Sequence, residues 1–165
     1  MDTRGLAQYA EGVFKATAGL MKMVPADKLN WRPSETNNWM TVGQLLEHLT
    51  ESTGAPIQMF ITGKFPAEIS QGLPPAEKMP SAPSVAVAME KLEADRKLTA
   101  KLLADLPEQD FRNRMVAAPW GGPPLPLWMQ LLSMVEHQVN HKAALFAYLK
   151  LLGLPVHTGH LYGVM

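Results

Sequence analysis

The chain contains no cysteine among its 165 residues. Disulfides, thiolate metal sites and a cysteine nucleophile are therefore excluded, because each of them requires a thiol. Any transition metal must instead be held by histidine, together with oxygen ligands or water.

Net charge is absent as well. The chain has 15 Lys and Arg residues and 15 Asp and Glu residues, which gives a pI of about 7.0. Binders of nucleic acid or of anionic membranes carry a basic face, so we expect a small-molecule partner and neither nucleic acid nor a membrane. No stretch approaches the roughly 20 apolar residues of a membrane span, and residues 1–5 are polar, unlike a signal peptide. We therefore expect a cytoplasmic protein.

Hydrophobic residues make up 47% of the chain, and its length suits one domain with a single core. We expect that domain to span residues 1–165. Apolar periodicity and helix stop signals predict four helical segments, at residues 3–23, 41–60, 84–106 and 126–152. Pro56 is expected to kink the second segment. Residues 114–119 are a candidate short hairpin.

Long connections separate the predicted helices, at residues 25–40, 63–83 and 107–125. The second connection contains Pro66, Pro74, Pro75, Pro80 and Pro83, so we expect an extended crossover in place of a tight turn. The predicted fold class is all-α, a four-helix bundle with long crossover connections.

His137 and His141 are four residues apart in the last segment and share one face of its helix. They belong to an apolar series spaced by three or four residues, which faces the core of a bundle. The series is Leu127, Leu131, Met134, His137, His141, Leu145, Tyr148 and Leu152. An unsatisfied buried polar group costs about 1–3 kcal/mol. A shared metal ion would satisfy both imidazoles, and so would hydrogen bonds to backbone or carboxylate groups.

His48 supplies a third imidazole from a second helix, where it lies at the edge of the apolar stripe. Together with His137 and His141 it would complete a three-histidine site that leaves positions open for chemistry. Glu47 and Glu51, beside His48, are expected to lie toward solvent.

Three other polar residues near these segments are expected to have structural or surface roles. Gln44 is expected to form a capping box with Thr41 at the start of the second helix. His157 and His160 follow Gly153 beyond the last helix and are expected to be surface histidines.

Two stretches carry a resemblance to a known family. Residues 39–49, WMTVGQLLEHL, are similar to the pattern W-x-x-x-x-x-L-x-x-H-L. Residues 140–153, NHKAALFAYLKLLG, are similar to a helix in which H-R-G-Q-L leads into L-R-L-L-G, and Trp120-Gly121-Gly122 adds a weaker match. With these residues the chain resembles the DinB-like family of metal-binding four-helix bundles.

The resemblance implies that His48, His137 and His141 bind one divalent transition metal, which would be zinc, nickel or iron. Some members resemble S-transferases and isomerases that use a low-molecular-weight thiol as co-substrate, and relatives commonly form homodimers. The chain departs from the family pattern after the last ligand, where Lys142-Ala143-Ala144 replaces Arg-Gly-Gln. Metal binding is therefore better supported than any particular reaction.

The sequence leaves three hypotheses. The preferred one is a metal-dependent enzyme whose ion lowers the pKa of water or of a thiol, with a thiol-dependent S-transferase ahead of a metal-dependent hydrolase. No carboxylate base is expected on the helical seam, which favours a nucleophile activated by the metal. The second is a non-catalytic metal-binding bundle for stability, sensing or stress response, and the third is a metal-free helical module with satisfied core histidines.

Overall fold

The computed structural model describes residues 1–36, 38–71 and 75–164. The long helices are α1 (Thr3–Met21), α2 (Val42–Leu49), α3 (Gly54–Thr62), α4 (Val85–Asp105) and α6 (Leu127–Leu151). Shorter elements are α5 (Glu108–Asn113), α7 (Thr158–Tyr162), the strands β1 (Met115–Val116) and β2 (Leu125–Pro126), and the 3-10 helices Ala26–Lys28, Ala67–Gln71 and Ala76–Lys78. The predicted all-α class is confirmed.

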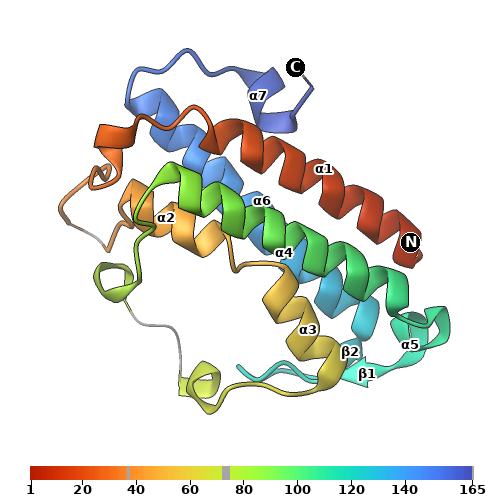
Figure 1. Ribbon diagram of the computed structural model, residues 1–165. Coiled ribbons are helices and arrows are strands. Elements are labelled where there is room, and N and C mark those ends of the chain that lie inside the picture. The colour runs from red at the N-terminus through yellow and green to blue at the C-terminus, as the bar shows by residue number, and fades with distance from the viewer. Residues whose placement is uncertain (37, 72–74, 165) are drawn as a thin grey trace.

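Four helical rods surround one core: α1, the α2–α3 pair, α4 and α6 (Figure 1). Helix α1 contacts α4 and α6, and both of these contact α2 and α3, so the pair lies opposite α1. In Figure 1 the α2–α3 pair and α4 run in the same direction, while α1 and α6 run the other way. Two parallel neighbours need a connection that returns along the bundle, which confirms the predicted crossover. Pro74 of that crossover lies outside the described residues.

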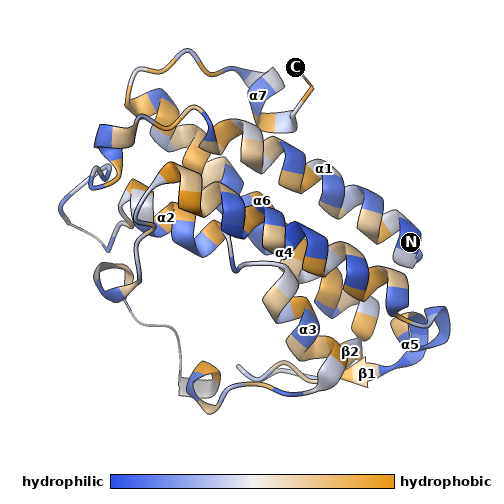
Figure 2. Ribbon diagram, in the orientation of Figure 1, coloured by the Kyte–Doolittle hydropathy of each residue, from blue (hydrophilic) through white to orange (hydrophobic). Residues whose placement is uncertain are grey.

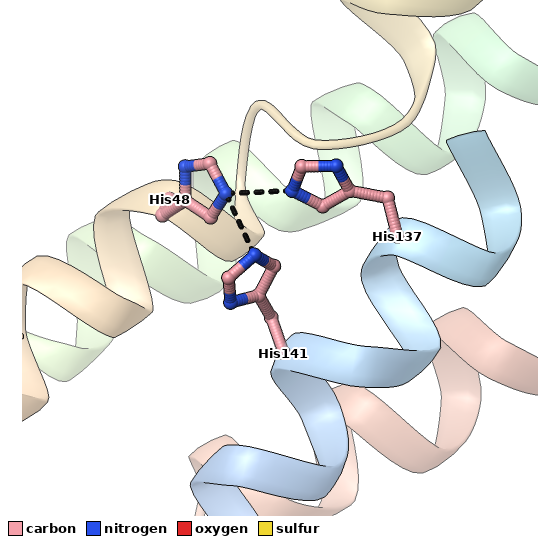
Figure 3. Close-up of side chains that lie close together, drawn as sticks. All are labelled: His48, His137 and His141. Carbon is pink, nitrogen blue, oxygen red and sulfur yellow. Dashed lines mark hydrogen bonds between the residues drawn. The ribbon is translucent and has the colours of Figure 1, made fainter. Parts of the chain in front are cut away.

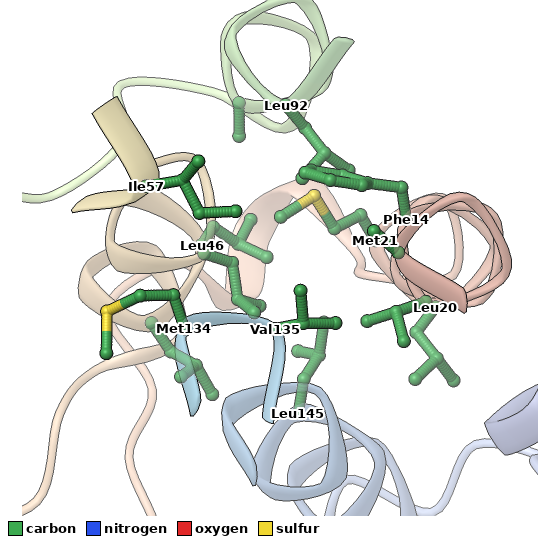
Figure 4. Close-up of a cluster of buried hydrophobic side chains, with 14 of the residues drawn as sticks. Phe14, Leu20, Met21, Leu46, Ile57, Leu92, Met134, Val135 and Leu145 are labelled. Atoms are coloured by element: carbon green, nitrogen blue, oxygen red, sulfur yellow. The ribbon is translucent and has the colours of Figure 1, made fainter. Parts of the chain in front are cut away.

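The core takes apolar side chains from every rod, while polar residues concentrate on the outer faces (Figure 2). Figure 4 shows Phe14, Leu20 and Met21 from α1, Leu46 from α2, Ile57 from α3, Leu92 from α4, and Val135 and Leu145 from α6. Their burial removes apolar surface from water, which is the main favourable contribution to folding. In the described part of the chain, no helix is long and apolar enough to cross a bilayer.

Signals at the helix ends are confirmed. Thr41 Oγ1 accepts a hydrogen bond from Gln44 N–H at 3.2 Å, and Gln44 Oε1 accepts one from Thr41 N–H at 2.9 Å, which forms the predicted capping box of α2. Gly153 has a φ of 79° just after α6. This left-handed conformation ends helices and favours glycine.

The predicted second helix is broken, where sequence suggested only a kink. Helix α2 ends at Leu49, and the hydroxyls of Thr50 and Ser52 donate to the carbonyls of Glu47 and Leu49 at 2.7 and 3.4 Å. Such side-chain bonds compete with the backbone bonds of a helix. Pro56 lies in the first turn of α3, where a missing N–H interrupts no helical bond.

Asp95 of α4 caps the start of α3. Its two carboxylate oxygens each lie 3.0 Å from Gly54 N–H, and Oδ1 accepts from Ala55 N–H at 3.3 Å. Burial raises the pKa of Asp95 to about 6, and the backbone N–H donors oppose this rise only in part. Asp95 therefore holds a proton at a pH where the unfolded chain has released it.

Asp95→Asn is expected to remove a pH dependence of stability. The folded protein keeps this proton up to about pH 6, while the unfolded chain loses it near pH 4. Asp95 therefore makes the free energy of unfolding decrease as the pH rises from about 4 to about 6. The amide keeps an acceptor for the N–H groups of α3 and cannot titrate. The free energy of unfolding of the variant, measured with urea at several pH values, should therefore lack this decrease. Glu90→Gln, on an exposed position of α4, is the control. If the free energy of unfolding depends on pH equally in Asp95→Asn and in wild type, the titrating group is not Asp95.

The hairpin prediction was wrong in its extent. Strand β1 pairs antiparallel with β2, with Met115 opposite Pro126 and Val116 opposite Leu125. Gly121 and Gly122 in the loop between the strands have φ of 100° and 99°, a backbone conformation that residues other than glycine rarely adopt. The loop therefore runs well past residue 119 before the chain returns. Helix α5 was also not predicted, because six residues are too few to show a helical period.

Candidate metal centre

The three predicted histidines meet at one point inside the bundle (Figure 3). His48 lies in the last turn of α2, and His137 and His141 lie on successive turns of α6. His48 Nε2 is 2.8 Å from His137 Nε2 and 3.1 Å from His141 Nε2. One nitrogen of each ring lies within 4.8 Å of the other two. The structure thus brings all three together from two helices that are far apart in sequence.

These distances fit one shared ion. Imidazole nitrogens lie about 2.0–2.1 Å from zinc, so two ligands at 90–109° to one another are separated by roughly 2.8–3.4 Å. The observed 2.8 and 3.1 Å fall within that range. A neutral imidazole offers only one N–H and one acceptor, so three converging Nε2 atoms are poorly satisfied by one another. The group could hold a metal ion.

The surroundings keep these imidazoles neutral. Burial, and next the neighbouring His137, lower the pKa of His48 to about 4. Burial followed by His48 and His137 lowers the pKa of His141 to about 3, and burial alone lowers that of His137. A neutral imidazole has the free lone pair that a metal needs. At pH 7 all three rings are therefore ready to act as ligands.

Gln138 fixes this part of α6. Its side chain is fully buried, accepts a hydrogen bond from Thr53 Oγ1 and donates one to Thr17 Oγ1 at 3.4 Å. The Thr17 hydroxyl donates in turn to Val13 O at 2.8 Å. These bonds join α1, α6 and the break between α2 and α3. They hold α6 in the rotation that points His137 toward His48.

Gln138→Leu should destabilise the fold. The change leaves the Thr53 and Thr17 hydroxyls without this partner in a buried place, at a cost of about 1–3 kcal/mol. Urea denaturation would measure the loss, with Gln58→Leu on the exposed side of α3 as the matched control. A loss no greater than that of the control would mean that these buried bonds contribute little.

Glu47 corrects a prediction, because it is buried and not turned to solvent. Only 5% of the residue is exposed, since α4 packs over this side of α2. One carboxylate oxygen pairs with Lys91 Nζ, while Oε2 has no hydrogen-bond partner among the described residues. Glu51 is exposed, as expected. A carboxylate thus lies beside His48, where periodicity alone indicated none.

Two openings reach the histidines. The larger is a cavity of about 820 Å³ with mostly apolar walls, and it includes His48 and His137. The smaller, about 380 Å³, lies along α6 and is lined by Ser133, Glu136, His137, Asn140 and His141. Tyr9 Oη donates to Glu136 Oε1 at 2.6 Å at the edge of this smaller opening. His137 lines both openings, so molecules could approach the centre from two directions.

The remaining histidines lie apart from the centre. His157 begins α7 and accepts a hydrogen bond from Gly159 N–H through Nδ1 at 3.2 Å, and its ring is 4.2 Å from that of His160. His157 is exposed and His160 partly exposed, in line with a surface position. Lys142, next to His141, donates to Leu161 O at 2.6 Å and so fastens the C-terminal segment.

Known proteins share this fold. A DinB-like protein from Bacillus subtilis superposes with a TM-score of 0.68 at 19% identity, over 92% of this chain and 96% of that one. A DinB-like protein from Bacillus cereus gives 0.68 at 18% identity, over 93% and 95%. No curated protein matches. The family model of the DinB superfamily matches residues 10–145, which include the three clustered histidines. The chain therefore belongs to the DinB superfamily.

Proposed function

We propose that this protein is a metal-dependent enzyme in which His48, His137 and His141 bind one divalent ion, zinc, nickel or iron. The observation that carries the proposal is the convergence of three Nε2 atoms, with separations from His48 of 2.8 and 3.1 Å, at the wall of a cavity. When bound, such an ion supplies Lewis acidity that lowers the pKa of water or of a thiol.

Within this class we propose a transferase that uses a low-molecular-weight thiol. A transfer reaction requires two substrates to reach one centre, and His137 lines two separate openings. Ser133, Glu136 and Asn140 offer hydrogen-bonding groups that suit a hydrophilic thiol in the smaller opening. The larger cavity would receive the electrophile. A hydrolase needs one organic substrate and water, so it has less use for the second opening.

Aromatic side chains around the larger cavity would limit the access of water. Phe60 packs edge-to-face against Phe65 and Trp120, with ring centroids 5.2 and 5.8 Å apart. Excluding water strengthens electrostatic interactions within a site. The chain's own part in the reaction is thus to hold three neutral imidazoles, separate two substrates and keep the electrophile in a dry place.

A thiol-conjugation assay tests this proposal. Protein loaded with zinc, nickel or iron would be mixed with a panel of low-molecular-weight thiols and 1-chloro-2,4-dinitrobenzene. We expect turnover with at least one pair of metal and thiol, its loss on chelation and in His141→Ala, and its retention in His160→Ala. Ester hydrolysis without thiol would favour the hydrolase. A metal-loaded protein inactive with every thiol would contradict the transferase and favour a sensing or stress-response role.

A further inference from the structure

We infer that the larger cavity selects a mainly apolar organic substrate without negative charge, and that Glu47 and Glu51 set this charge preference. This assignment rests on the proposed function, because it names the substrate class of the same centre. It is also open to a separate test, since the cavity can bind a ligand when no metal is present.

The size and walls of the cavity indicate an apolar ligand. Its volume of about 820 Å³ lies within the usual range of small-molecule sites, roughly 300–1,000 Å³. Four segments supply its apolar side chains: Met59 and Phe60 from α3, Phe65 and Ile69 from the crossover, Trp120 from the loop between the strands, and Met134 from α6. Methionine side chains adapt readily to ligand shape. The cavity therefore suits rings or alkyl chains.

Trp120 gives the cavity an aromatic wall that the core does not use. The residue is 59% exposed, although its ring packs edge-to-face with that of Phe60, with centroids 5.8 Å apart. An exposed indole beside a cavity offers a large apolar face to a ligand at little entropic cost. We therefore expect Trp120 to contribute to the binding of any ring system in this cavity.

The charges along the cavity are negative. Glu47 and Glu51 both line it, and no lysine or arginine does so among the described residues. Lys91, which pairs with one oxygen of Glu47, offsets one of these two charges. A carboxylate or sulfonate on the ligand would therefore face a net negative charge, which is unfavourable.

A bound metal ion would change this balance of charge. Lys91 already offsets one of the two glutamate charges, so the glutamates leave part of the charge of a divalent ion uncompensated. The preference against anions is therefore expected of the metal-free protein.

Two fluorescent probes test this inference. N-phenyl-1-naphthylamine is neutral and carries an N–H, and 8-anilinonaphthalene-1-sulfonate is the same ring system with one added sulfonate. We expect the neutral probe to bind metal-free wild type at least tenfold more tightly than the sulfonate. Glu51→Gln, at an exposed position, should narrow this ratio, while Asp110→Asn on α5 should leave it unchanged. Trp120→Ala should lower the affinity for both probes by similar factors. Equal affinities in wild type, or tighter sulfonate binding, would overturn the inference.

His141→Ala separates this inference from the proposed function. His141 does not line the larger cavity among the described residues, so the variant should lose metal and keep the probe preference. A preserved preference in a protein that shows no thiol transfer would remove the proposed enzyme and leave the cavity assignment standing. Absence of the preference in metal-free wild type that becomes active when loaded with metal would remove the cavity assignment alone.

Discussion

Replacing His137 with alanine is expected to weaken zinc binding by more than about 100-fold. Loss of a group that only supports a ligand costs 10–100-fold in metal affinity, and this change would remove one of the three proposed ligands outright. His137 is the strongest choice because its Nε2 lies 2.8 Å from that of His48, the shorter of the two contacts that His48 makes in the cluster. Competition with a chromophoric chelator at fixed pH would measure the affinity of each protein.

His157→Ala is the matched control for this experiment. His157 is a histidine on the surface at the start of α7, outside the cluster of three. Its loss should leave zinc affinity within about twofold of wild type. If His137→Ala keeps the wild-type affinity, or if His157→Ala lowers it as strongly, the metal lies somewhere other than between α2 and α6.

Replacing Gly54 with alanine should cost about 3 kcal/mol of stability, the upper end for overpacking. A Cβ atom at this position would lie 2.6 Å from Asp95 Oδ1, 2.9 Å from Asp95 O and 3.0 Å from Thr99 Oγ1. The carbonyl belongs to the backbone of α4 and cannot swing aside. Helix α3 would have to move away from α4, which also disturbs the cap that Asp95 provides. Urea denaturation at pH 7 would measure the change.

Gly12→Ala in α1 should have the opposite sign. A Cβ atom there meets nothing within 4 Å. Alanine in the interior of a helix is favoured over glycine by about 0.5–1 kcal/mol. Both substitutions replace glycine with alanine. The difference between their effects on the free energy of unfolding therefore reports the close approach of α3 to α4. Equal effects at the two positions would show that this approach is looser than the structure indicates.

Much of the fold could be predicted because its signals are local. The capping residues Thr41 and Gln44 and the terminal Gly153 lie within a few residues of the helix ends that they define. The spacing of His137 and His141 is local as well. His48 is 89 residues from His137, so periodicity could offer it only as a candidate third imidazole, and the resemblance to a known family supported joining it to the pair.

Other parts of the site depend on partners distant in sequence. Glu47 is buried because Lys91, 44 residues later, packs over it. Asp95 caps a helix that begins 41 residues earlier, and Gln138 bonds to Thr53 across 85 residues. Periodicity describes the face of one helix at a time. It could not reveal which neighbour covers that face or which polar groups meet there.

X-ray absorption at the metal edge of the loaded wild-type protein tests the central claim most directly. Three histidine ligands predict nitrogen scatterers at about 2.0–2.1 Å for zinc, with the outer-shell pattern of three imidazole rings. His137→Ala should reduce that pattern or abolish it together with the metal. A first shell of oxygen atoms alone, or an imidazole signal unchanged in His137→Ala, would contradict a centre built from His48, His137 and His141.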